Sequence, residues 1–364
     1  MKTSIFDYLK NKKFKSINDL VDTLNLVGPY IDGWSLTNPI TKSQLLSYCT
    51  TLKRKESYNI FKIPKKSGGH RTIVAPIENL KNIQRALLKY LEGVFIPNES
   101  ATGFISGKSI KDNAIMHIGK NCIINLDLEN FFPSITKDML KVAIRNELPD
   151  SIPSDEVINT ICNLCTIPIE DNKEVLAQGA PTSPLLSNIV MKKFDENVES
   201  FCKERGMAFS RYADDITLSF NSSNENNQDI LSHFRCLVKS YGLKLNEDKI
   251  KVLKKGTRQE VTGIISNEKA NLSRRYVKQL RVFLYLWEKN GYEEAQTIYQ
   301  NDFRNHKSGE LQNVIKGKLN YLRMIKGNQD PTFITLNKRY MGLLWQKKKE
   351  EKLKKDNESV KEIL

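Results

Sequence analysis

Two adjacent aspartates, Asp214 and Asp215, interrupt an apolar, strand-prone segment that extends from Phe209 to Phe220. Neighbouring carboxylates are costly in such a segment, because each disfavours the ionised form of the other. If the segment folds as a hairpin, both side chains lie at its turn, where a bound cation would neutralise them. A turn that faces water would also explain the pair, so the interpretation depends on other acidic residues.

A third acidic residue, Asp127, ends the apolar segment that begins at Ile123 and shortly precedes the aromatic pair Phe131 and Phe132. If its strand lies beside the hairpin, three carboxylates form a site of hard oxygen ligands. Mg²⁺ prefers such ligands and completes its shell with water and substrate phosphates. Two such ions about 3.5–4 Å apart can activate a hydroxyl and stabilise a leaving oxygen. The three aspartates therefore predict a nucleotidyl transfer.

A turn-forming segment, Gln178-Gly-Ala-Pro-Thr-Ser-Pro184, lies between these acidic residues and opens a predicted helix. The free backbone amides at a helix N-terminus can face an incoming nucleotide or a template strand. By itself the segment is a common junction between a loop and a helix. Its position between the acidic motifs is what indicates a functional role.

A basic hairpin is expected around Gly68 and Gly69, because apolar and polar residues alternate before this turn and a short strand-prone run follows it. The hairpin carries Lys65 and Arg71, whose charges could clamp a triphosphate. A solvated lysine-rich turn is the alternative. The functional interpretation is favoured for Arg71, which adjoins a strand.

Helical and strand patterns alternate along the chain, which predicts a mixed α/β (α+β) fold. Short helices are expected within residues 1–55. Longer helices are expected at residues 80–95, 137–148, 157–165, 184–205, 230–241, 276–287 and 311–325. Strands are expected at residues 58–63, 72–75, 122–126 and 261–265, with two more within 208–220.

The composition indicates a polyanionic partner, because 57 Lys and Arg residues against 42 Asp and Glu residues leave a net charge of +15. Apolar residues make up 39% and charged residues 27%, which argues against disorder. Without a long apolar run or a signal core, we expect no membrane association and a cytoplasmic location.

The six cysteines are expected to be reduced, and Cys162 and Cys165 to be buried thiols rather than zinc ligands.

The order of the motifs resembles the palm of a reverse transcriptase over residues 58–265: the strand aspartate, Gln-Gly-x-Pro-x-Ser-Pro, Tyr-Ala-Asp-Asp, and Leu243-Lys-Leu-Asn-x-x-Lys249. The resemblance implies a right-hand polymerase with fingers, palm and helical thumb, plus an N-terminal helical extension, and RNA-templated DNA synthesis. The implied domains are the extension at 1–55, fingers and palm at 56–265, the thumb at 266–345 and a charged C-terminal tail at 346–364.

The same resemblance implies that Asp127, Asp214 and Asp215 are the catalytic ligands of two Mg²⁺ ions, with the Leu128 carbonyl as an additional ligand.

Five further residues are implied to contact the deoxynucleoside triphosphate. Phe132 stands where the family keeps an aromatic side chain that excludes the ribose 2′-hydroxyl. Gln178 would line the nucleotide pocket, and Lys249 would assist the departure of pyrophosphate. Lys65 and Arg71 would reach the triphosphate.

Two short motifs resemble those of retron-type reverse transcriptases: Asn113-Ala-Ile-Met-His117 and Val261-Thr262-Gly263. The resemblance implies that a structured non-coding RNA serves as template and primer. It also implies that the residues of the two motifs which bind RNA or DNA are Asn113, His117, Thr262 and Gly263. The enzyme would prime from a guanosine 2′-hydroxyl and make a branched RNA–DNA hybrid used in anti-phage defence. A toxic effector, where present, would be a separate protein chain. The alternative for Asn113 and His117 is a helix-capping amide and a partly buried histidine.

Arg274 and Arg275 follow Ser273, an expected N-cap of a helix. Cations in the first helical turn oppose the helix dipole, so a phosphate partner would account for them, and two solvated side chains are the alternative.

Three other functions are compatible with parts of the sequence. The nearest is a bacterial defence reverse transcriptase that is not a retron and copies another RNA. An inactive RNA-binding scaffold is disfavoured because all three aspartates are present. A group II intron enzyme is disfavoured because we expect no maturase or DNA-cleaving segment after the thumb.

Overall fold

The computed structural model describes residue 9 and residues 11–65, 68–169, 173–222, 226–304 and 309–361, with the side chains of 354–361 left aside. The tip of the expected basic hairpin, most of the first ten residues of the N-terminal extension and the last three residues of the tail lie outside these ranges. The chain divides into two compact units. Unit 1 comprises residues 1–109 and 121–252, and unit 2 comprises residues 110–120 and 253–364.

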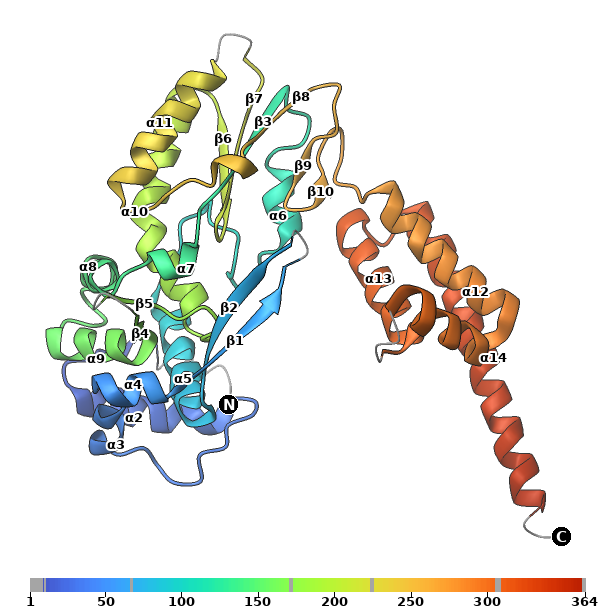
Figure 1. The fold of residues 1–364 in the computed structure, drawn as a ribbon, viewed down its shortest axis with the longest axis horizontal. Coiled ribbons are helices and arrows are strands. Elements are labelled where there is room, and N and C mark those ends of the chain that lie inside the picture. Colours follow the sequence, from blue (N-terminus) through green and yellow to red (C-terminus); the bar gives the residue numbers. More distant parts are fainter. Residues whose placement is uncertain are drawn as a thin grey trace. The chain divides into compact units, whose positions relative to one another are not determined.

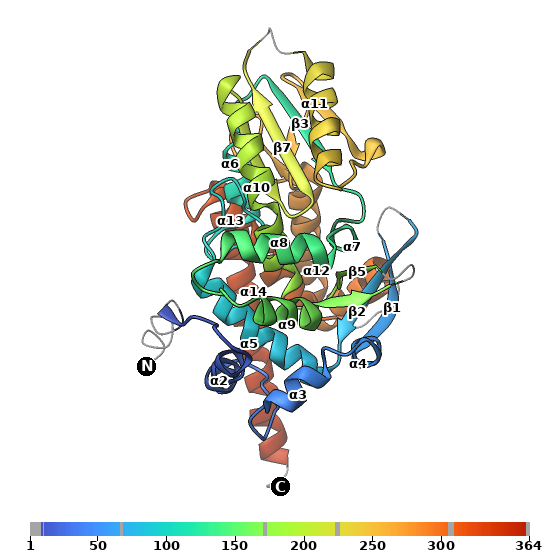
Figure 2. The same cartoon turned by 90° about the vertical axis from the view of Figure 1, so that its left-hand side faces the viewer.

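A four-stranded sheet forms the centre of unit 1, with the strand order β6-β7-β3-β8. Its strands are β3 (Cys122–Asp127), β6 (Ala208–Tyr212), β7 (Asp215–Phe220) and β8 (Lys251–Lys254). Strand β7 pairs antiparallel with both β3 and β6. Strand β3 is almost continuously buried, as expected for the middle of a sheet covered by other elements. Helices α10 (Ser183–Glu204) and α11 (Asn227–Ser240) lie beside this sheet (Figures 1 and 2).

Two hairpins and a layer of helices complete unit 1. Strand β1 (Tyr58–Pro64) pairs with β2 (His70–Pro76), and β4 (Thr166–Pro168) pairs with β5 (Glu174–Leu176). The helices are α2 (Ile17–Val27), α3 (Lys42–Ser47), α4 (Thr51–Glu56), α5 (Glu78–Val94), α7 (Phe131–Ser134), α8 (Lys137–Glu147) and α9 (Asp155–Cys165), with the short turns η1 (Gly28–Tyr30) and η3 (Glu247–Lys249).

Local sequence signals explain where several of these helices begin. Ser16 and Thr41 form capping boxes with Asp19 and Gln44, so the first backbone N–H groups of α2 and α3 are satisfied. The apolar residues of α5 recur at helical spacing and pack into the core of unit 1. The N-terminal helices therefore share one hydrophobic core with the sheet-bearing part of the unit.

Unit 2 is mainly helical (Figure 1). Its elements are α6 (Ile110–Ile115), β9 (Glu260–Val261), β10 (Ile264–Ile265), α12 (Arg274–Ile298), the π-helical turn η4 (Tyr299–Phe303), α13 (Leu311–Lys326) and α14 (Pro331–Lys361). Gly291 has non-helical dihedral angles and kinks α12. A short segment from the middle of the sequence, α6, thus belongs with the C-terminal part of the chain.

The expected helices and most expected strands are present, with boundaries shifted by a few residues. The expected single strand at residues 261–265 is wrong. Thr262 and Gly263 both adopt positive φ angles, 46° and 84°, which turn the chain back so that β9 and β10 form a hairpin. The sequence does not predict three short features, namely the β4–β5 hairpin, β8 and α6. Each is too short to show a clear hydrophobic period.

All six cysteines are free, and Cys162 and Cys165 are buried in α9, as expected. None of the described helices combines the length and the apolar character of a membrane span.

Candidate active site

The pairing of β3 with β7 brings the acidic residues together. Asp127, the last residue of β3, lies directly opposite Asp215, the first residue of β7. Side chains at opposed positions of an antiparallel pair project from the same face of the sheet. Asp214 lies in the turn between β6 and β7, and its carbonyl oxygen accepts a hydrogen bond of 3.1 Å from the Leu128 N–H. The sheet thus gathers three carboxylates from segments that are almost 90 residues apart.

The pKa values of Asp214 and Asp215 are both raised. Partial desolvation and the neighbouring charges of Asp214 and Asp127 raise the pKa of Asp215 to about 6, although Asp215 keeps an exposed surface. Desolvation and the Asp127 charge also raise the pKa of Asp214, whereas Lys249 and Arg71 act in the opposite direction. A raised carboxyl pKa means that the ionised form is disfavoured, and a bound cation would reverse this effect.

Lys249 forms an ion pair with this acidic group. Its Nζ lies 2.8 Å from Oδ1 and 3.0 Å from Oδ2 of Asp127, which it reaches from η3. Asp127 and its neighbours raise the pKa of Lys249, so the ammonium stays charged. The N–H of Asn246 donates to the Asp127 carbonyl oxygen at 2.8 Å and holds the η3 segment against the end of β3.

The donor set fits a hard divalent cation. Asp127, Asp214 and Asp215 supply carboxylate oxygens only, and the charge that raises the pKa of Asp215 is the charge a cation would relieve. In the described part of the chain, no three acidic, histidine or cysteine side chains lie close enough together to hold a metal ion. Lys249 pairs with Asp127 in this arrangement.

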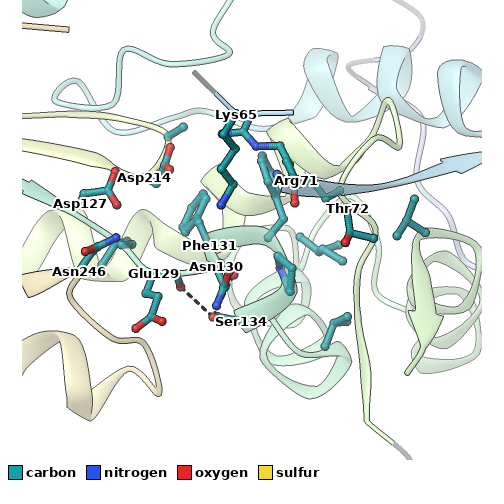
Figure 3. A pocket seen from close by; sticks show the side chains of 18 of the residues that line it. Lys65, Arg71, Thr72, Asp127, Glu129, Asn130, Phe131, Ser134, Asp214 and Asn246 are labelled. Carbon is teal, nitrogen blue, oxygen red and sulfur yellow. Dashed lines mark hydrogen bonds between the residues drawn. The ribbon is translucent and has the colours of Figure 1, made fainter. Parts of the chain in front are cut away.

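A cleft of about 820 Å³ opens beside the acidic residues. Asp127 and Asp214 border it on one side, and Lys65, Arg71 and Thr72 enter from the β1–β2 hairpin on another (Figure 3). The cleft therefore has an acidic wall that faces a basic hairpin. This arrangement suits a substrate that carries both phosphates and metal ions.

The proposed nucleotide contacts mostly line this cleft. Phe132 and Gln178 are both lining residues, as are Lys65, Arg71 and Lys249. The Gln178 carbonyl oxygen accepts a hydrogen bond of 2.8 Å from the Val74 N–H, which ties the loop before α10 to β2. Leu128 also lines the cleft, although its side chain is buried.

Close packing explains the glycine of the Gln-Gly motif. A Cβ on Gly179 would lie 2.9 Å from Ile73 Cγ2 and 3.1 Å from the Val74 carbonyl oxygen, and its φ of 134° also disfavours a side chain. Gly179 thus allows the Gln178 loop to lie directly against the basic hairpin.

The predicted nucleic-acid contacts lie in unit 2. Asn113 and His117 are fully buried, and Asn113 Nδ2 donates to Thr262 Oγ1 at 3.4 Å. The two retron-type motifs are therefore packed against one another, and their contact with RNA stays a prediction. Gly263 is exposed at the β9–β10 turn.

Arg274 and Arg275 are exposed in the first turn of α12. Ser273 is the N-cap of that helix, as expected, and accepts a hydrogen bond of 3.2 Å from the Tyr276 N–H. Among the ion pairs of unit 2 within residues 253–304 and 309–353, none has either arginine as a partner.

Sequence reasoning missed three residues beside the site. Phe104, with a positive φ of 61°, lines the cleft and contacts the Phe132 ring at 6.3 Å between centroids. Asn246 belongs to a quoted motif but received no role. Arg211 is buried directly before the Tyr-Ala-Asp-Asp turn, and an arginine within an apolar strand was the available signal.

Comparison with known proteins defines the class of this fold and site. Residues 63–278 match the family model described as reverse transcriptase (RNA-dependent DNA polymerase). In the solved structures, a telomerase from Candida albicans in complex with telomeric RNA is similar with a TM-score of 0.44 and 14% identity, covering 79% of this chain and 63% of that one.

Individual relatives of known type show which kind of reverse transcriptase this chain resembles. The retron Ec83 reverse transcriptase of Escherichia coli is 34% identical over 298 residues, which cover 78% of this chain and 86% of the relative. The retron Mx65 reverse transcriptase of Myxococcus xanthus is 31% identical, with 76% of this chain and 63% of the relative covered. The chain therefore belongs to the reverse transcriptases of the retron type, and it is an RNA-directed DNA polymerase. The predicted mixed α/β reverse transcriptase fold is confirmed.

Proposed function

We propose that this chain copies part of a structured non-coding RNA into DNA from a primer that is the 2′-hydroxyl of a guanosine in that RNA. The product would be a branched RNA–DNA hybrid that takes part in anti-phage defence, with a separate protein as effector. The proposal is supported by the relation to retron enzymes, by the position of Asp127 opposite Asp215, and by the cleft that Asp127 and Asp214 share with Lys65 and Arg71.

Asp127, Asp214 and Asp215 would hold two Mg²⁺ ions, with the Leu128 carbonyl as a further ligand. Bound there, the ions would supply Lewis acidity for the attacking hydroxyl and for the leaving oxygen of the nucleotide. Bound cations would favour the ionised form of these carboxylates. The ammonium of Lys249, which pairs with Asp127 in this structure, would neutralise charge on the departing pyrophosphate.

The remaining cleft residues would select and bind the deoxynucleoside triphosphate. Lys65 and Arg71 carry positive charge to the cleft, so they would bind the triphosphate oxygens. Phe132 would occupy the space that a ribose 2′-hydroxyl needs, and Gln178 would line the base and sugar pocket.

Unit 2 would contact the template and product through the exposed Arg274 and Arg275 and the exposed turn at Gly263. The side chains of Asn113 and His117 are buried, so they would act on the RNA indirectly. Together with Thr262, which Asn113 contacts, they would hold this turn in place. The cytoplasmic location stays a prediction.

The test is to express the chain together with the genomic DNA that flanks its gene, purify it, and sequence the bound nucleic acid. We expect a short DNA whose 5′ end stays attached to an RNA guanosine after ribonuclease digestion and is released by a 2′,5′-debranching enzyme. A DNA with a free 5′ end would contradict retron priming and favour another defence reverse transcriptase. Absence of DNA would favour the scaffold. The matched control is Asp214→Ala with Asp215→Ala, which should yield RNA only.

The defence role is tested separately. Cells that carry the chain and its flanking genes are challenged with a panel of phages, and plaque numbers are compared with those on cells carrying the double aspartate variant. If the double aspartate variant restricts the same phages as strongly as the unchanged locus does, DNA synthesis has no role in defence.

A further inference from the structure

A buried arginine lies directly beneath the turn that carries Asp214 and Asp215. Arg211 has no exposed surface, although it belongs to β6 only three residues before Asp214. Its neighbour Tyr212 projects from the opposite face of the strand, because successive side chains alternate. The side chain of Arg211 therefore enters the interior between β6 and α10, where a charge is costly unless it is fully paired.

The partners of Arg211 come from one face of α10. Nε and Nη2 donate to the two carboxylate oxygens of Asp195 at 2.7 and 2.6 Å, and Nη1 donates to Asn188 Oδ1 at 3.1 Å. Asn188 and Asp195 are seven residues apart, so they lie on the same side of the helix. Both are buried, and this bidentate arrangement fixes the plane of the guanidinium.

The same guanidinium also holds the turn. Nη1 donates to the Ala213 carbonyl oxygen at 3.1 Å. Ala213 has a φ of 57°, a left-handed conformation that L-residues other than glycine disfavour. This carbonyl is part of the peptide group between Ala213 and Asp214. The hydrogen bond therefore orients the peptide group that leads into the Asp214 Cα, and with it the direction of the Asp214 side chain.

A second contact confines the turn from another side. Asn188 Nδ2 donates to the Gly103 carbonyl oxygen at 2.9 Å, and a Cβ on Gly103 would lie 2.7 Å from the Ala213 nitrogen. The Gly103 backbone thus lies against the turn, and the same asparagine links it to Arg211. Contacts with Arg211, Asn188 and Gly103 thus hold Ala213 in an unfavourable left-handed conformation. The residues that follow it directly are Asp214 and Asp215.

We propose that Arg211 is a positioning residue for DNA synthesis, acting through the Ala213 carbonyl oxygen to fix the direction of Asp214 and Asp215. The inference rests on the proposed metal-binding role of these aspartates. A purely structural role is a weaker explanation, because a buried ion pair can often be replaced by apolar residues of similar size without loss of stability. What apolar residues cannot replace is the hydrogen bond to the turn.

That difference defines the experiment. The double variant Arg211→Met with Asp195→Leu keeps the volume and leaves no charge unpaired, so we expect it to fold. Its melting temperature should fall only by the cost of the lost hydrogen bonds to Asn188 and Ala213. In single-nucleotide incorporation on an RNA template we expect kcat to fall by about 10- to 100-fold, because the carboxylates lose their fixed direction. The KM for the deoxynucleotide should stay within about threefold, since the basic hairpin is unchanged.

A spectroscopic readout separates positioning from loss of fold. With ¹³C-methyl-labelled alanine, the Ala213 methyl signal is assigned from its disappearance in Ala213→Gly. We expect this signal to shift or broaden in the double variant while most other alanine signals stay in place. The matched control is Arg54→Met, which removes another buried arginine whose carboxylate partner is Glu174. It should leave kcat and the Ala213 signal unchanged at a temperature where the variant is folded.

A folded double variant with unchanged kcat and an unchanged Ala213 signal would overturn the proposal. If the double variant does not fold, Arg211→Lys serves instead, because its ammonium still pairs with Asp195 but cannot form the fork that also reaches the turn. Unchanged kcat in Arg211→Lys would overturn the proposal equally. The variant Asp214→Ala with Asp215→Ala is run beside both. Full activity in that variant would contradict the metal-binding role itself, which is a different failure.

Discussion

Lys249 donates from one ammonium group to both carboxylate oxygens of Asp127, at 2.8 and 3.0 Å. The contact joins η3 to the end of β3, 122 residues apart in sequence, and it lies at the acidic edge of the cleft. Asp127 therefore has two competing cationic partners, the lysine and any metal ion that binds there.

Replacing Lys249 by Gln should tighten metal binding while slowing DNA synthesis. The lysine side chain is 57% exposed, so its ion pair is worth about 0.2–1 kcal/mol, which corresponds to a rise in affinity of up to about fivefold. Binding of Mn²⁺ is measured by electron paramagnetic resonance, and incorporation is measured in parallel. Lys244→Gln, which removes an exposed lysine paired with Glu129, is the control. Weaker Mn²⁺ binding in Lys249→Gln would contradict this competition.

Replacing Asp214 and Asp215 by Ala should abolish deoxynucleotide incorporation. RNA affinity should stay within about threefold, because phosphate contacts with basic side chains dominate such binding. Primer extension on an RNA template and a filter-binding titration measure the two properties. A double variant that extends primers at the normal rate would remove these residues from the metal site.

Replacing Phe132 by Ala should admit ribonucleotides. Phe132 lines the cleft, and its loss creates space next to the sugar position, which should reduce discrimination by about 10- to 100-fold. The ratio of kcat/KM for a deoxynucleotide to that for its ribonucleotide gives the answer. Phe132→Tyr keeps the ring and should keep the selectivity, and an unchanged ratio in Phe132→Ala would exclude the role.

The stability of unit 2 should decrease below pH 6.5 because of His117. Burial lowers the pKa of His117 to about 3, with a smaller contribution from Lys120. Between this value and its unfolded pKa of about 6.5, the unfolded chain binds the proton and the folded chain does not, so stability is lost as the pH falls. The loss from this residue is about 2 kcal/mol between pH 6.5 and pH 5.

Urea unfolding followed at several pH values checks this expectation. His117→Gln should be less stable at neutral pH and should depend less on pH in that range. The control His70→Gln changes an exposed histidine and should retain the pH dependence of the unchanged protein. The idea fails if His117→Gln loses stability on acidification as steeply as the unchanged protein.

RNA binding should weaken steeply with salt, as the net charge of +15 indicates. Arg274→Ser with Arg275→Ser should reduce the slope of log K against log salt by about 1.4–1.8 if both side chains contact phosphates. Lys203→Ser with Lys239→Ser removes two exposed lysines from α10 and α11 and is the control. If the two double variants have equal slopes, Arg274 and Arg275 do not contact phosphates and are solvated side chains.

The sequence by itself determined the chemistry and most of the elements. Hydrophobic periodicity located α5, α9, α10 and the central strands because each is long enough to show its repeat. The three aspartates could be singled out because carboxylates are costly in apolar, strand-prone segments, and their order carried the family resemblance that the comparisons confirm.

Tertiary structure alone decided which residues meet. Only the register of β3 with β7 places Asp127 opposite Asp215, and register depends on the packing of whole faces rather than on local pattern. The motif of Asn113 implies a contact with RNA or DNA, yet folding buries this side chain against Thr262. The sequence marks Arg211 only as an arginine within an apolar strand. Its partners are not visible there, since they lie on a helix 16 and 23 residues away and its contact with Ala213 depends on a left-handed turn. Such contacts are set by the meeting of distant elements, which short-range spacing does not encode.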